Sequence, residues 1–176
     1  MQATHMVNTA ESPGIGVDEI GASGAADLGS ASFVLADSPG PMLPLSILGL
    51  SVEATGIHSG SDSSFTFGPN EGFLSGDASF HSLTVTGELV GDKTLTFSGD
   101  AKKDTVLYSS PTVTITLDEQ TKLLPPAATS GIIGPTITTD AIDIRLNHAT
   151  FAGQTIPGDF DIGQSSASYA LMPPHA

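Results

Sequence analysis

Short stretches in which apolar and polar residues alternate recur along this chain, with turn-forming residues between them. In the clearest stretch, Val113, Ile115 and Leu117 alternate with three threonines. A period of two places the apolar side chains on one face of a β-strand. No sustained apolar stripe with the 3.6-residue period of an amphipathic helix occurs. The pattern therefore predicts an all-β protein.

The alternating stretches predict about eight to ten short strands at regular spacing, which is typical of an antiparallel β-sandwich or a closed β-barrel. With 176 residues, the chain fits one domain. The expected strands cover residues 32–36, 45–57, 65–67, 80–90, 95–97, 105–108, 112–117, 142–146 and 165–171.

The expected domain organisation has three parts. Residues 1–29 are rich in Gly, Ala and Ser without strong periodicity, which predicts a mobile N-terminal arm that could serve as a lid. Residues 30–171 form a single β domain. Residues 172–176 form a frayed tail.

One hairpin register can be predicted from the hydrophobic pattern. A three-residue loop over 91–93 would pair Leu89 with Leu95 and Gly87 with Phe97, which keeps the apolar residues on one face. A one-residue slip would turn every side chain of the strand to the opposite face. The three-residue loop is therefore expected.

Charge and composition exclude several classes of partner. The formal net charge is −14, and such a field repels nucleic acid and anionic membranes. The absence of cysteine excludes disulfides and thiolate metal sites. No apolar run is long enough to predict membrane insertion. No cofactor is indicated. A hydrophobic small molecule and a second copy of the chain remain open as partners.

Catalytic candidates are few. Glu53 and Glu88 lie on expected strands, and His81 shares the parity of Leu83, which predicts that it lies on the apolar face. A histidine there is more often a core residue than a ligand. The serine-rich run 60–64 has no nucleophile-elbow pattern and is expected to be a flexible turn. Whether the chain is an enzyme stays open.

Two aspartates form the pattern in this sequence that most resembles a metal site. Asp159 and Asp161 have a spacing that places both carboxylates on one face of a strand, where calcium could find two oxygen ligands. The EF-hand pattern is absent. Solvated acids at a turn are the simpler explanation in so acidic a chain, so no metal site is predicted.

The phenylalanines separate the two architectures. A solid sandwich should bury Phe65, Phe67, Phe80 and Phe97 together. A barrel could instead use them to line an apolar pocket that binds a hydrophobic small molecule. Such a protein would be a carrier or a cofactor-free cyclase of specialised metabolism, where catalysis is mostly positioning and exclusion of water.

A resemblance adds to the first alternative. The segments 137–146 (ITTDAIDIRL) and 158–167 (GDFDIGQSSA) resemble the two closing strands of actinobacterial secreted β proteins of the "choice-of-anchor" type. The region 137–167, which contains both segments, covers about a fifth of the chain, and the resemblance implies an exported β domain. The leading functional expectation is thus an extracellular or cell-surface, non-catalytic β-sandwich that serves adhesion or structure.

Overall fold

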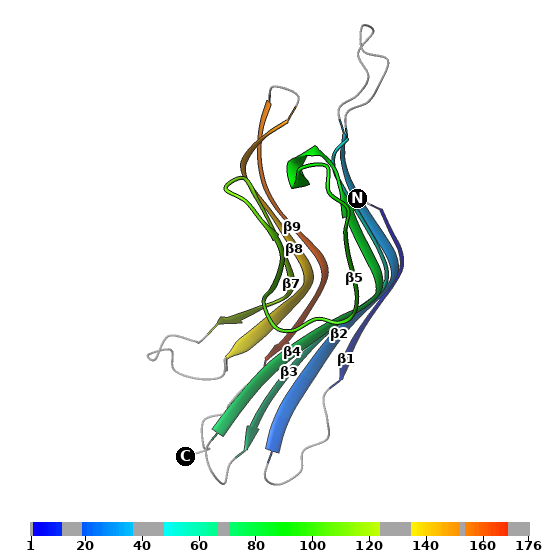
Figure 1. Cartoon of the computed structure of the whole chain (residues 1–176). Coiled ribbons are helices and arrows are strands. Elements are labelled where there is room, and N and C mark those ends of the chain that lie inside the picture. Colours follow the sequence, from blue (N-terminus) through cyan, green and yellow to red (C-terminus); the bar gives the residue numbers. More distant parts are fainter. Residues whose placement is uncertain are drawn as a thin grey trace, which may run out of the picture.

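Two antiparallel sheets packed face to face form the protein (Figure 1). The computed structural model describes residues 2–11, 19–36, 48–66, 71–123, 135–151 and 154–168. One sheet has five strands in the order β1-β2-β3-β4-β5, and the other has four in the order β6-β7-β8-β9. The bounds are β1 Gln2–Glu11, β2 Glu19–Ala36, β3 Leu48–Thr66, β4 Glu71–Thr86, β5 Leu95–Asp100, β6 Thr105–Ser109, β7 Val113–Leu123, β8 Thr136–Phe151 and β9 Gln154–Ser168, with a 3₁₀ helix η1 at Glu88–Val90.

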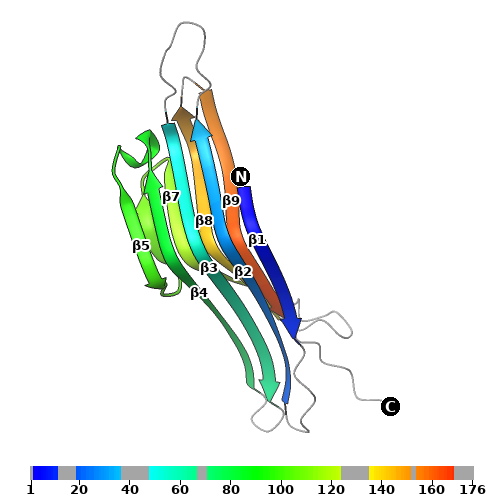
Figure 2. The same cartoon turned by 90° about the vertical axis from the view of Figure 1, so that its right-hand side faces the viewer.

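The prediction of an antiparallel all-β fold is confirmed. The described strands pair into two separate sheets rather than one closed barrel, so the sandwich is the alternative that the structure supports (Figure 2). Several strands are much longer than expected. Residues 60–64, expected to be a turn, lie inside the 19-residue strand β3. Within the described residues, no helix has the length and apolar character needed to cross a membrane.

Branched apolar residues build one half of the sandwich interior. These residue types favour pleated, half-buried surfaces. Val113, Ile115 and Leu117 of β7 are fully buried, as their alternation predicts. They belong to a hydrophobic cluster that also contains Leu50 and Val52 of β3 in the other sheet. We call this region, which includes β5 and β6, the apolar half.

A row of residues that are left out of the regular strand pairing crosses the five-stranded sheet. Gly29 of β2 faces Gly56 of β3, and Gly56 in turn faces His81 of β4. Gly56 has a φ of +53°, a conformation that glycine adopts without strain. Ala54 and Ile57 are both buried although they are three residues apart, so the inward parity reverses at this row. The row is therefore a matched break in the pairing, because the register of β2 with β3 and of β3 with β4 is the same on both sides of it.

A second row crosses the four-stranded sheet. Asp118 of β7 faces Ala141 of β8, which faces Gly163 of β9. Asp118 and Gly163 have positive φ angles of 52° and 69°. Both sheets are bent along their length, and the outer face of the four-stranded sheet is concave (Figure 1). The bend thus divides the sandwich into two halves with independent side-chain parity.

Small polar residues fill the interior beyond the bend, in a region that we call the polar half. Ser59 donates a hydrogen bond to the Ser165 hydroxyl at 2.7 Å, and Ser61 donates one to Thr139 Oγ1 at 3.0 Å. All four side chains are buried. Hydroxyl pairs across the two sheets therefore take the place that apolar contacts hold in the other half.

Glycines let the sheets approach closely in the polar half. A Cβ on Gly24 of β2 would lie 2.3 Å from the Ser166 carbonyl oxygen of β9, and one on Gly76 of β4 would lie 2.0 Å from Thr139 Oγ1. No real Cβ tolerates such contacts. The spacing of the sheets therefore leaves no room for a side chain at Gly24 or Gly76.

The predicted boundary at residue 30 differs from the structure. β2 begins at Glu19, and its first half pairs with β3 from Thr66 back to Ile57. Ala26 and Leu28 lie in the core. The pattern of small residues carries little hydropathy signal, which is why this segment was expected to be a mobile arm. Residues 172–176 lie outside the described residues.

The predicted hairpin register is wrong, but its face assignment is right. Leu95 pairs with Val85 instead of Leu89, a shift of four residues along β4. β4 ends early because Gly87, with a φ of +134°, leads into η1. An even shift leaves Leu95 on the same face as Val85. The hydrophobic pattern therefore fixes the parity of this hairpin but not the length of its loop.

Candidate functional site

An acidic cluster lies on the concave outer face of the four-stranded sheet, just beside the bend. Ile142 and Ile144 of β8 point into the core, so Asp143 between them points outward. On β9, Asp161 is the direct partner of Asp143, and Asp159 is two residues away on the same face. Strand register alone thus brings three carboxyl groups together.

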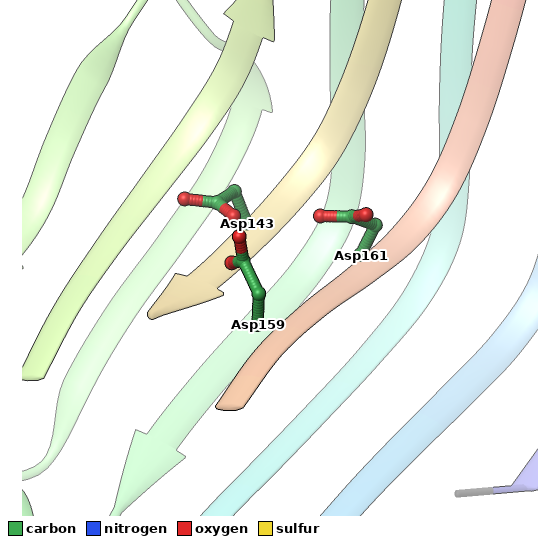
Figure 3. A group of neighbouring side chains, drawn as sticks. All are labelled: Asp143, Asp159 and Asp161. Carbon is green, nitrogen blue, oxygen red and sulfur yellow. The ribbon is translucent and has the colours of Figure 1, made fainter. Parts of the chain in front are cut away.

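Figure 3 shows Asp159 and Asp161 directed toward Asp143 on the neighbouring strand. One carboxylate oxygen from each of the three lies within 4.8 Å of the others. The Asp143 side chain is 3% exposed, whereas that of Asp159 is 64% exposed. The cluster therefore has a buried floor and a rim that is open to solvent.

One arginine serves several of these acids. Arg145 of β8 makes an ion pair with Glu119 of β7, and its Nε lies 3.1 Å from Asp143 Oδ2 and 3.7 Å from Asp159 Oδ1. Even so, Asp143 Oδ2 and Glu119 Oε2 are buried without any hydrogen bond. Buried polar atoms without a partner are uncommon in folded proteins.

Crowding of the carboxyl groups changes their proton affinity. Burial, followed by the neighbouring carboxyl groups of Glu119 and Asp159, raises the pKa of Asp143 to about 9. Burial also raises the pKa of Asp161, and the Asp159 carboxylate adds to that effect. Asp140, hydrogen-bonded by Gln164 at 2.8 Å, has its pKa raised in the same direction by burial. The site therefore favours protons or other cations.

Family models, curated proteins and solved structures give no match to the chain.

The chemistry of the cluster must therefore be inferred from its own atoms. Its groups are carboxylates and one guanidinium, so it offers hard oxygen ligands. Within the described residues, the cluster contains no histidine, and the chain has no cysteine. This set of groups can bind a hard cation through oxygen.

The predicted catalytic candidates do not come together. Glu53 lies exposed on the outer face of β3, and Glu88 lies exposed in η1. The prediction that His81 lies on the apolar face is wrong, because the bulge between Phe80 and Leu83 turns it to solvent. In the described part of the chain, no hydrogen bond or ion pair links these three side chains.

Two of the four phenylalanines can be placed. Phe80 is buried, and its ring meets that of Phe97 edge-on with centroids 5.8 Å apart. Phe65 lies in β3, opposite Ile20 and Gly72, and its side chain is not described. Phe67 lies outside the described residues. Phe80 belongs to the core, and the half-buried Phe97 of the adjacent strand β5 packs against it.

A second polar group lies on the outer face of the five-stranded sheet. His58 Nδ1 is 2.7 Å from Asp27 Oδ1, and His58 Nε2 is 3.5 Å from Asp77 Oδ2. All three side chains are more than a third exposed. Exposed pairs of this kind contribute little to stability. The carboxyl cluster, with its buried floor, is the stronger candidate for a site.

Asp143 is the residue that sequence reasoning missed. Asp159 and Asp161 do share one face, as their spacing suggested. Asp143 is the outward residue of the alternating segment 142–146, so its face could be predicted. Its place beside Asp161 depends on the pairing of β8 with β9, which spacing along the chain does not specify.

Proposed function

We propose that this chain is a non-catalytic β-sandwich module that works outside the cell, in adhesion or as a structural element. The observation that carries the proposal is the filled interior. The described inward side chains pack against one another in the apolar half and bond to one another in the polar half. The weak catalytic candidates lie on the outside.

Composition and topology support the same proposal. The acidic, cysteine-free chain has a surface suited to solubility without disulfides. Long antiparallel strands bent together give an extended scaffold, since β3 alone has 19 residues. The resemblance to exported β proteins falls on β8 and β9.

Two measurements test the proposal. Protease treatment of intact cells that express the chain with its native flanking sequence should remove it, and a cytoplasmic marker should survive. In parallel, a panel of hydrophobic small molecules should leave the melting temperature of the purified chain unchanged. Protection from protease would contradict the extracellular address. A rise of several degrees with an apolar ligand would instead support a carrier or cyclase.

A further inference from the structure

We propose that Asp143, Asp159 and Asp161 bind one divalent cation on the concave face, and that calcium is the ion that fits best. The site lies on neighbouring strands and not in a loop, so no calcium-loop motif in the sequence predicts it. This inference does not rest on the proposed function.

The spacing of the oxygens suits a single ion. Calcium binds oxygen ligands at about 2.4 Å, so two oxygens on the same ion lie at most about 4.8 Å apart. The three aspartates each provide an oxygen that meets this limit with respect to the other two. β8 and β9 hold them by strand register, so the arrangement is built into the sheet.

A buried oxygen at the floor of the cluster points to a missing ligand. The Asp143 side chain is 3% exposed, and its Oδ2 forms no hydrogen bond although Arg145 Nε is 3.1 Å away. A buried acceptor without a hydrogen bond destabilises the folded state, because its contact with water is lost and not replaced. A cation that coordinates this carboxylate would remove that cost.

The local charge balance favours an added cation. Among the residues that the structure describes, Arg145 is the one basic side chain with ion pairs in the cluster, and it faces Glu119, Asp143 and Asp159 together. Asp161 adds a further carboxylate. One guanidinium cannot neutralise four acids, and its closest contact is with Glu119. The cluster therefore holds more carboxyl groups than its guanidinium can balance.

The donor set favours calcium over magnesium. Magnesium prefers six ligands in near-ideal octahedral geometry and usually keeps most of its water, with one or two carboxylates. Three carboxylates around one point, two of them on the open rim, suit the larger ion and leave room for water. The weakest class of calcium sites has dissociation constants of the order of 10⁻⁴–10⁻³ M, so the binding experiment must cover the millimolar range.

The test is calcium binding by the whole chain after removal of metals. Equilibrium dialysis with radioactive calcium in 150 mM NaCl should find one ion per chain, and magnesium should compete weakly. Ten millimolar calcium should raise the melting temperature by several degrees, and EDTA should reverse the shift. Asp143→Asn and Asp161→Asn should each weaken calcium binding at least tenfold.

Asp92→Asn is the matched control. It removes the same charge from an exposed turn residue whose φ of +55° asparagine also tolerates. This variant should bind calcium as the wild type does. Because Asp161 is exposed, its variant should fold even if the Asp143 variant does not. The proposal is overturned if the wild type binds no calcium, or if Asp161→Asn binds it as tightly as Asp92→Asn, which would indicate diffuse attraction to the acidic surface.

Discussion

The long strands of both sheets run through both halves of the sandwich, and the two halves differ in what holds the sheets together. In the apolar half, side chains such as Leu50 and Ile115 are removed from water. In the polar half, Ser59 and Ser61 reach across to hydroxyl groups of the other sheet. Glycines bring the sheets close enough for these short side chains to meet. Two sheets can therefore be held together by large apolar side chains in one region and by the close approach of their backbones in the next.

The stabilising energies of the two arrangements differ in size. Burial of one large aliphatic side chain contributes about 1.5–3 kcal/mol, whereas a net hydrogen bond contributes about 0.5–1.5 kcal/mol. The apolar half should therefore dominate the free energy of unfolding. The polar half should depend more on steric fit, because its glycines have no room for a side chain.

Ile115→Ala should give the largest loss of stability. Ile115 is fully buried in the apolar half, and truncation there should lower the free energy of unfolding by about 4 kcal/mol. Urea denaturation would measure the change. Thr96→Ala, an exposed change on β5, is the control and should have a small effect. A loss below about 1 kcal/mol for Ile115→Ala would mean that the apolar half does not dominate.

Gly24→Ala should cost nearly as much, although it adds only one methyl group. The new Cβ would lie 2.3 Å from the backbone oxygen of Ser166, so the two sheets would have to separate. Overpacking of this kind costs about 3 kcal/mol. Gly99→Ala would not serve as a control because of its φ of +88°. Ala25→Gly, on the opposite face of β2, is the comparison variant, and its loss of stability should be smaller. A neutral Gly24→Ala would show that the polar half is loosely packed.

Ser61→Ala should have a smaller effect. It removes a hydroxyl that bonds Thr139 Oγ1 and lies 2.9 Å from Ser165 Oγ. Loss of these buried hydrogen bonds should lower stability by about 1.5 kcal/mol. Thermal melting against the exposed substitution Ser98→Ala would measure it. Equal melting temperatures would show that the hydroxyl pairs contribute nothing.

The acidic cluster beside the bend should make the stability of the protein depend on pH. Because the pKa of Asp143 is raised to about 9, the folded protein keeps a proton that an unfolded aspartate loses near pH 4. Unfolding then releases that proton, so stability should fall as the pH rises from about 4 to about 9. The slope for one proton is at most about 1.4 kcal/mol per pH unit.

Asp143→Asn should flatten this slope without abolishing it. Asp118, Asp140 and Asp161 also have a raised pKa and give the same sign. Urea denaturation at pH 5 and pH 8, in EDTA, would compare the variant with the wild type. The same pH dependence in both proteins would contradict the assignment to Asp143.

Local alternation predicted the apolar half well. Val113, Ile115 and Leu117 are buried as their pattern requires, and the segment 142–146 has the predicted inward and outward faces. These assignments succeed because hydropathy changes at every residue. The position of Asp159 and Asp161 on one face follows from the same rule.

The polar half and the site could not be predicted in this way. Where Ser, Gly and Ala alternate with one another, hydropathy hardly changes, so the pattern within 19–28 gave no strand. His81 was placed on the wrong face because the inward parity reverses inside β4, where Phe80 and Leu83 are both buried. Asp143 joins the β9 aspartates through cross-strand pairing, which local spacing does not encode.

The polar interior also bears on how the fold responds to temperature. Exposure of apolar surface raises the heat capacity on unfolding, and exposure of polar surface lowers it. Hydrophobic stabilisation weakens on cooling. The half built around Ser59, Ser61 and Thr139 should therefore flatten the stability curve of the whole chain. Its hydroxyl pairs should keep their strength in the cold, where the contacts around Ile115 lose theirs.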